Sequence, residues 1–254
     1  MQPHLHFLET DQEWESAEDF LGGDGLCGIV LPVPASTQLI TPHEHERVAE
    51  LAALIKQLAP VHYIATGPCT NLAELCRFLG DDLQKYITTI SIMGGALKVA
   101  GNSGHKDVHS GRQYAEFNFY CDPFAVDEVL RCGVPVYVVS WDTTQRLTIP
   151  LSRAQILCAR DDAASFVRDL MLQFFERFGL KNGREFEFND PAAVWLPRSA
   201  PQEFQEKRLA IVLAPDEFGK LIEVSHGHPV SFHSCEDLRI PEILDELLAA
   251  LQLV

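Results

Sequence analysis

The chain has 254 residues, and its content of 46% hydrophobic and 22% charged residues is typical of a folded globular protein. Twenty Lys and Arg against 36 Asp and Glu give a formal net charge of −16. This balance argues against a nucleic-acid partner and against an anionic membrane surface, because both need clustered basic side chains. We find no linker or repeat that would divide residues 1–254, and we expect one compact, soluble domain.

The N-terminus and the cysteines both predict a cytoplasmic protein. Residues 1–15 contain neither a basic n-region nor an apolar h-region, so we recognise no secretory signal in them. No apolar run approaches the roughly 20 residues that span a bilayer. The 7 cysteines form no CxxC pair, and most lie in apolar stretches. This pattern predicts buried, reduced thiols.

Apolar runs of strand length alternate with helical periodicity after residue 41, where Thr41-Pro42-His43-Glu44 has the pattern of a capping box. In chain order we predict a helix over 46–59 with an apolar stripe of Val48, Leu51, Leu54, Ile55 and Leu58, a strand over 61–66, a helix over 71–79, a strand over 88–93, a helix over 123–132, a strand over 134–141, a helix over 151–178, a helix opening at Asp190-Pro191, a hairpin of 208–214 and 220–225, and a helix over 241–253.

This alternation predicts an α/β fold with a mostly parallel, open sheet and helices on both faces. Ligands of such sheets bind beyond the carboxyl ends of the strands, here at Thr66-Gly67-Pro68, Met93-Gly94-Gly95 and Trp141-Asp142. None of these ends is a GxGxxG fingerprint or is followed by a Walker lysine, which argues against nucleotide phosphates. Polar, uncharged strand ends in an acidic chain suit a neutral hydroxylated ligand or a cation held by oxygens.

Asn102, Glu116 and Asn118 are candidate ligand-binding residues. Glu116 and Asn118 are two residues apart, so in an extended segment both side chains would point to one face. A carboxylate beside an amide offers acceptors and donors to a sugar diol, although the same residues are also common in a solvated loop. Asp190 is either an N-cap or a ligand of a hard cation.

Several motifs, taken together with their order along the chain, carry more information than any one motif alone. They are GGDGLCG (22–28), ATGPCTNLAEL (65–75), ISIMGGA (90–96), GN (101–102), AEFNFYCDPFA (115–125), WDTTQ (141–145) and NDPAAVW (189–195). Together they resemble the inosine/uridine-preferring nucleoside hydrolase family, from about residue 21 onward. The resemblance is densest between residues 61 and 145.

The resemblance implies hydrolysis of the N-glycosidic bond of purine or pyrimidine ribonucleosides to free base and ribose. Family members hold a Ca²⁺ ion that chelates the ribose hydroxyls and the attacking water, and the transition state resembles an oxocarbenium ion. By motif match, Thr66 and Asp190 would be metal ligands. Met93, Asn102, Glu116, Asn118 and Asn189 would line the substrate site. The resemblance also implies a homodimer or homotetramer.

The chain departs from the family pattern at several points. The DxDxxxDD cluster that ends the family's first strand, and that supplies the general base, is absent: the segment before Gly22 contains Asp11 and Asp19 without that spacing. We therefore expect the initial strands of the family to be missing, which leaves the catalytic base unassigned. Leu21 and Asn189 stand where the family has histidines, and an insertion at 103–114 carries His105 and His109.

Two hypotheses follow. The chain is either a ribonucleoside hydrolase or a catalytically inactive homologue that binds ribose or a nucleoside, or acts as a subunit. Calcium-dependent turnover would distinguish them. The base preference depends on the insertion and on four phenylalanines that either stack on a base or fill the core: Phe166, Phe174, Phe175 and Phe178.

Overall fold

The structure is a computed structural model that describes residues 44–104, 114–176, 183, 185–233 and 240–253. Contacts between residues divide the chain into two compact units. The larger one, called the sheet unit here, comprises Gln38–Thr148 and Glu187–Leu251. The smaller one comprises Met1–Thr37, Ile149–Phe186 and Gln252–Val254. The single domain expected over 1–254 stays a prediction.

The sheet unit is built on six strands in the order β1-β2-β3-β8-β6-β7. Neighbouring strands from β1 to β8 run parallel, and β6 pairs antiparallel with both β8 and β7. The mostly parallel α/β sheet predicted from the sequence is therefore confirmed. The strand bounds are β1 Val61–Ala65, β2 Ile87–Met93, β3 Val136–Val139, β8 Pro229–His233, β6 Gln205–Ile211 and β7 Leu221–Glu223.

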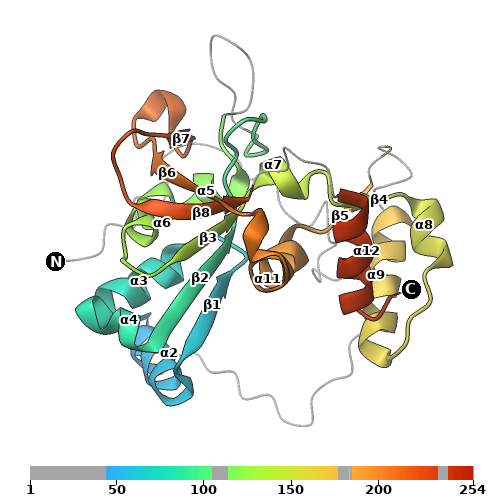
Figure 1. The fold of residues 1–254 in the computed structure, drawn as a ribbon, viewed down its shortest axis with the longest axis horizontal. Helices are drawn as coiled ribbons and strands as arrows, with labels where there is room; N and C mark the ends of the chain where they lie inside the picture. Colours follow the sequence, from blue (N-terminus) through green and yellow to red (C-terminus); the bar gives the residue numbers. More distant parts are fainter. Residues whose placement is uncertain (1–43, 105–113, 177–182, 184, 234–239, 254) are drawn as a thin grey trace. The chain divides into compact units, whose positions relative to one another are not determined.

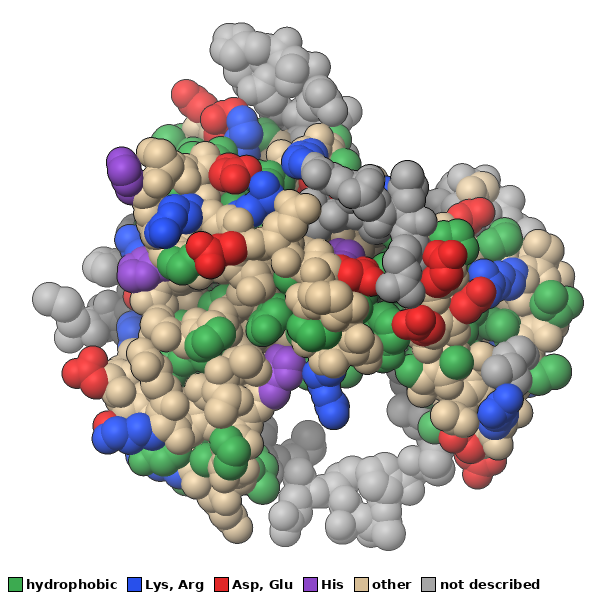
Figure 2. Space-filling view, in the orientation of Figure 1, with side chains coloured by type: hydrophobic (Ala, Val, Ile, Leu, Met, Phe, Trp, Pro, Cys, Tyr) green, Lys and Arg blue, Asp and Glu red, His purple; other side chains and the backbone are tan. Residues whose placement is uncertain are grey.

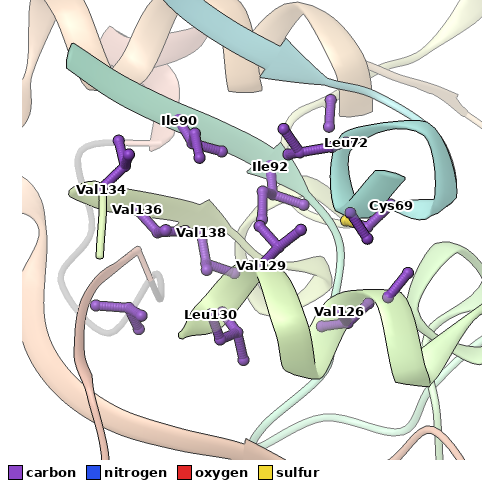
Figure 3. Close-up of a cluster of buried hydrophobic side chains, with 14 of the residues drawn as sticks. Cys69, Leu72, Ile90, Ile92, Val126, Val129, Leu130, Val134, Val136 and Val138 are labelled. Atoms are coloured by element: carbon purple, nitrogen blue, oxygen red, sulfur yellow. The ribbon is translucent and has the colours of Figure 1, made fainter. Parts of the chain in front are cut away.

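Helices cover both faces of this sheet (Figure 1). α3 (Thr70–Leu79) packs against α2 (Glu44–Leu58) and α6 (Pro123–Leu130) on one face, whereas α11 (Asn189–Ser199) packs against β2 and β3 on the other. Figure 3 shows the core between the sheet and the first group: strand residues such as Ile92 and Val138 face Val129 of α6 and Leu72 of α3. The remaining short helices of the sheet unit are η1 Gly80–Asp82, α4 Leu83–Tyr86, α5 Phe117–Cys121, α7 Trp141–Thr144, η3 Pro201–Glu203, η4 Pro215–Glu217 and α12 Ile240–Ala250.

The first helix buries a narrower face than the apolar stripe predicted. Ala52 and Ile55 are buried, whereas Leu54 and Leu58 are 50% and 59% exposed. Residues 48, 51, 52 and 55 fall on one side of a helix with 3.6 residues per turn, and this side alone faces the core. The proposed capping box at Thr41-Pro42 lies outside the described residues.

Two predicted elements differ from the structure, and one strand of the six-stranded sheet has no predicted counterpart. The segment around Glu116 and Asn118 is not extended, because α5 begins at Phe117 with the Glu116 side chain as its cap. The predicted helix over 151–178 is broken into α8 (Leu151–Ile156) and α9 (Asp162–Phe174), because Leu157 is extended and Asp161 accepts from the N–H of Ala164 to start a new helix. β8 was not predicted.

In the smaller unit, α8 packs against α9, and an aromatic group of Phe174, Phe175 and Phe186 gathers at the end of α9. Phe175 is 2% exposed, so it fills the core of this unit. Phe178 lies outside the described residues. The short strands β4 (Thr148–Ile149) and β5 (Phe186–Glu187) pair with each other where the chain passes between the two units.

No helix in the described part of the chain is both long enough and apolar enough to cross a membrane.

On the face drawn in Figure 2, acidic and basic side chains are interspersed. Arg77 and Glu128 form a bidentate pair, with Nη1 donating to the two carboxylate oxygens at 2.9 and 3.1 Å.

Candidate functional site

The ends of β2 and β3 are joined at the carboxyl edge of the parallel strands. The N–H of Gly94 donates to the carbonyl of Val139 at 3.2 Å, and the N–H of Trp141 donates to the carbonyl of Gly95 at 2.8 Å. A Cβ atom on either Gly94 or Gly95 would overlap the ring of Phe119. The glycines therefore let the strand end lie against a buried aromatic side chain.

The Glu116 carboxylate accepts hydrogen bonds from backbone N–H groups at the end of β2 and at the start of α5. Oε2 accepts from the N–H groups of Gly95 at 2.9 Å and Phe119 at 3.1 Å, and Oε1 accepts from the N–H of Asn118 at 2.9 Å. The residue is 2% exposed, and burial raises the pKa of its carboxyl despite these bonds. About three of its four acceptor positions are therefore used within the protein.

The two asparagines complete the arrangement. Asn118 donates through Nδ2 to the carbonyl of Met93 at 3.1 Å, and Asn102 accepts through Oδ1 from the N–H of Phe117 at 2.8 Å. Met93, Glu116 and Asn118 are thus linked by hydrogen bonds at the end of β2, and Asn102 joins them through the backbone of Phe117; these four residues are called the polar cluster here. The sequence indicated these four residues together with Asn189 as a substrate site, and that role stays a prediction. It missed that Glu116 and Asn118 meet through a helix cap and not through an extended face.

Asp142 is a supporting residue whose role the sequence did not reveal. Its carboxylate accepts from the N–H groups of Leu97 at 2.8 Å and Lys98 at 2.7 Å, and the residue is 6% exposed. It therefore fixes the segment that follows Gly95. The available signal was its position directly after the strand predicted over 134–141.

The short helix α7, which contains Asp142, is anchored by the buried side chain and the carbonyl of His233. The hydroxyls of Ser140 and Thr143 donate to the carbonyl of His233 at 2.7 and 2.9 Å, and Thr143 Oγ1 lies 2.8 Å from His233 Nδ1. Burial lowers the pKa of His233, although Glu203 lies 3.5 Å from Nε2 and opposes that shift. α7 is thus tied to the end of β8 as well as to the polar cluster.

Asp190 and Asn189 lie at the start of α11. Phe188 is the N-cap, so Asp190 lies in the first turn, and its interpretation as an N-cap is wrong. Asp190 is exposed as a residue, yet partial desolvation raises the pKa of its carboxyl, and its charge in turn raises the pKa of Glu116. Asn189 donates to Glu187 at 3.3 Å, and its buried Oδ1 has no hydrogen-bond partner within the described residues.

The carboxylate of Asp190 also borders a cavity of about 610 Å³ between α11 and α12. Trp195, Val194 and Leu247 give this cavity an apolar lining, and Arg198 lies farther along α11. The volume is in the range of small-molecule pockets.

The described residues do not complete a calcium site. Thr66 follows β1 and is exposed, and its carbonyl and the Asp190 carboxylate together offer at most three oxygens, whereas Ca²⁺ takes six to eight. Across the described ranges, no group of three His, Cys, Asp or Glu side chains could hold a metal ion. In the same part of the chain, no hydrogen bond joins Thr66 or Asn189 to the polar cluster.

The fold and the site define an open α/β protein with an amide- and carboxylate-lined site at the carboxyl edge of its parallel strands. The chain belongs to the inosine-uridine preferring nucleoside hydrolase family, whose model matches residues 7–234. The family predicted from the motifs is confirmed, and the match begins before residue 21, where the resemblance was expected to start.

Several known proteins are similar to this chain. The pyrimidine-specific ribonucleoside hydrolase RihA of Escherichia coli O9:H4 (strain HS) is 32% identical over 188 residues, which are 71% of this chain and 55% of that protein. The chain thus spans about half the length of the curated relatives it matches.

Two solved structures share the fold. The purine-preferring ribonucleoside hydrolase from Gardnerella vaginalis has a TM-score of 0.73 at 19% identity, over 96% of this chain and 77% of that one. A plant nucleoside hydrolase has a TM-score of 0.74 at 18% identity, over 93% and 75%.

Proposed function

We propose that this protein hydrolyses the N-glycosidic bond of ribonucleosides, releasing the free base and ribose. The observation that carries the proposal is the polar cluster at the carboxyl edge of a sheet with the fold of nucleoside hydrolases. Amide and carboxylate groups held by the backbone present a fixed set of donors and acceptors, which suits the hydroxyls of a sugar. Family membership and similarity to ribonucleoside hydrolases support the same conclusion.

In this proposal, Asn102, Asn118 and the remaining acceptor position of Glu116 bind ribose hydroxyls. Met93 would line the sugar, and Asn189, with its unpartnered Oδ1, would face the substrate from the start of α11. Attack of water on the anomeric carbon breaks the bond to the base, and positive charge develops on the sugar ring. The negative charges of Asp190 and Glu116 are placed to stabilise it.

A requirement for calcium follows from the family resemblance and remains a prediction. Because Thr66 and Asp190 supply too few oxygens, a calcium site would need further ligands. A cytoplasmic location and a homodimer or homotetramer are likewise predictions.

The test is release of base from uridine and from inosine by the purified 254-residue chain, first with added calcium and then with a chelator. Turnover that stops on chelation supports both the reaction and the metal. Turnover that survives chelation supports the reaction and contradicts the metal. A folded chain that releases no base from either nucleoside contradicts the proposal and favours the inactive, ribose-binding homologue.

The base preference is also read from this experiment, since relatives with both preferences are known. RihA is named as pyrimidine-specific, and the Gardnerella vaginalis protein is named as purine-preferring. Both nucleosides are therefore needed in the assay.

A Glu116→Gln variant tests the sugar-binding role. An amide nitrogen cannot accept, so one or more of the three backbone N–H groups would lose its partner, a loss of about 1–3 kcal/mol per buried group. We expect weaker ribose recognition for uridine and inosine alike, seen as a parallel fall in kcat/KM. A loss that differs strongly between the two bases would contradict the assignment. Free ribose as a competing inhibitor gives a second measure that does not involve a base.

A further inference from the structure

The side of α11 that points away from the sheet is apolar, like the side that packs on it. The sheet-facing side consists of four buried residues, Ala192, Ala193, Leu196 and Pro197. Since each residue of a helix turns by about 100°, Pro191, Val194 and Trp195 fall on the opposite side. Val194 is 43% exposed. A helix with apolar residues on both sides is normally covered on both, so this outer side is a candidate contact surface.

The cavity of about 610 Å³ between α11 and α12 lies on this outer side. From α12, Leu247, Ala250 and Leu251 line it. Among the described residues that line the cavity, none is an acidic residue of α12, and Asp245 falls on the opposite side of that helix from Leu247. The wall that α12 contributes is therefore apolar and uncharged.

Arg198 gives one end of this cavity a positive charge. It lines the cavity one helical turn after Val194, on the same side of α11. In the part of the chain that the structure describes, no hydrogen bond or ion pair joins Arg198 to another residue. The chain has 36 acidic residues against 20 basic ones, so carboxylate partners are abundant in it. An arginine left without one beside an apolar cavity is available to an anion from solution.

The two charged residues of the cavity lie at its opposite ends. Asp190 and Arg198 are eight residues apart on α11, which is about 12 Å along the helix axis. This separation exceeds the screening length of about 8 Å at physiological ionic strength, so Asp190 neither neutralises Arg198 nor strongly repels an anion bound to it. Between these ends, Trp195 offers an aromatic face to a flat ring.

We propose that this cavity binds an organic anion that consists of a carboxylate attached to a flat, apolar ring system. The guanidinium of Arg198 presents paired N–H donors that match a carboxylate, and the neighbouring hydroxyl of Ser199 also lines the cavity and adds a donor. The ring lies against Trp195 and Leu247. The volume is sufficient for a bicyclic ring. This site is on the side of α11 opposite β2 and β3, and its ligand is independent of nucleoside hydrolysis.

The experiment titrates the full chain by calorimetry with three ligands that share one ring system. They are 1-naphthaleneacetate, its neutral amide 1-naphthaleneacetamide, and the cation 2-(1-naphthyl)ethylamine. We expect the carboxylate to saturate one site with a Kd below about 1 mM, the amide to bind about three- to tenfold more weakly, and the amine to bind most weakly. The net charge of −16 repels anions in general, so a preference for the carboxylate needs a local positive charge.

Three variants separate the contributions of charge and ring. Arg198→Gln removes the charge, so the affinity for the carboxylate should fall to that for the amide, while the affinity for the amide stays the same. Trp195→Leu should weaken the carboxylate and the amide by similar factors. Arg77→Gln makes the same change of charge on α3, across the sheet from α11, and should leave all three affinities unchanged. Far-UV circular dichroism of each variant shows that it is folded.

Three results would overturn the proposal. The first is a folded wild-type chain that shows no saturable binding of 1-naphthaleneacetate. The second is equal affinity of the wild type for the carboxylate and the amide, since Arg198 would then not contact the ligand. The third is a preference for the carboxylate that survives in Arg198→Gln, because the anion would then bind elsewhere.

Discussion

At neutral pH, the Asp190→Asn variant is expected to resist urea better than the wild-type chain while it loses nucleoside hydrolysis. Partial desolvation raises the pKa of the Asp190 carboxyl, so the ionised form is disfavoured in the folded state. Asparagine has nearly the same shape and carries no charge. Activity should fall by more than the roughly 10- to 100-fold typical of residues that only support a metal ligand.

The pH dependence of this effect has a definite sign. Because the folded-state pKa of Asp190 lies above the unfolded value near 3.9, the folded state binds the proton more tightly. The contribution of this group to stability is complete below the unfolded pKa and is lost as pH rises through the folded pKa. The urea midpoints of wild type and variant should therefore separate at neutral pH and converge on acidification.

Asp162→Asn is the matched control, since Asp162 also lies exposed in the first turn of a helix, α9. A carboxylate there interacts favourably with the helix dipole, so this variant should lose about 0.3–1 kcal/mol at neutral pH. If Asp190→Asn lost stability in the same way, the desolvated carboxylate would be the wrong explanation. If it kept full hydrolysis, its place in the site would be wrong.

Gly101→Ala is expected to have the largest effect on stability. A Cβ atom on Gly101 would overlap the backbone carbonyl of Ala115, and backbone atoms cannot move aside as a flexible side chain does. The overlap would push apart the segments that carry Asn102 and Glu116. We expect a loss of more than about 4 kcal/mol in the free energy of unfolding, or failure to fold, and no hydrolysis.

Gly67→Ala provides the comparison. A Cβ atom there meets no atom within 4 Å, so this variant should stay within about 0.5 kcal/mol of the wild type. Urea unfolding of both variants measures the difference. Similar midpoints for the two would show that the segments at 101 and 115 are not held together as described.

Much of the sheet unit could be predicted because its signals are local. α3 has an apolar face that repeats with the helical period, and it ends at Gly80, whose φ of +52° suits glycine. β2 is rich in β-branched residues and ends at the paired glycines Gly94 and Gly95. β8 escaped prediction because Pro229–His233 is short and begins with proline, and because its parallel partner β3 is remote in sequence. No local signal records such a partner.

The sequence named the four residues of the polar cluster but did not indicate how they are held together, and their role in binding a substrate stays a prediction. A spacing of two residues fits an extended strand, but Glu116 gains more by capping α5 and binding Gly95 than by lying on a strand face. Asp142 was visible only as a polar residue at a strand end, since its partners are backbone N–H groups of another segment. Residues such as Asp24, His105 and His109 lie outside the described part of the chain.

The central place of β8 affects how the protein is made. Ser140 and His233, which are bonded at the ends of β3 and β8, are separated by 93 residues. A ribosome that adds about 5–20 residues per second needs roughly 5–20 s to synthesise that stretch. During this time β8 has not been synthesised, so the backbone groups along one edge of β3 lack their partner strand. Chaperones would have to shield this open edge in the nascent chain.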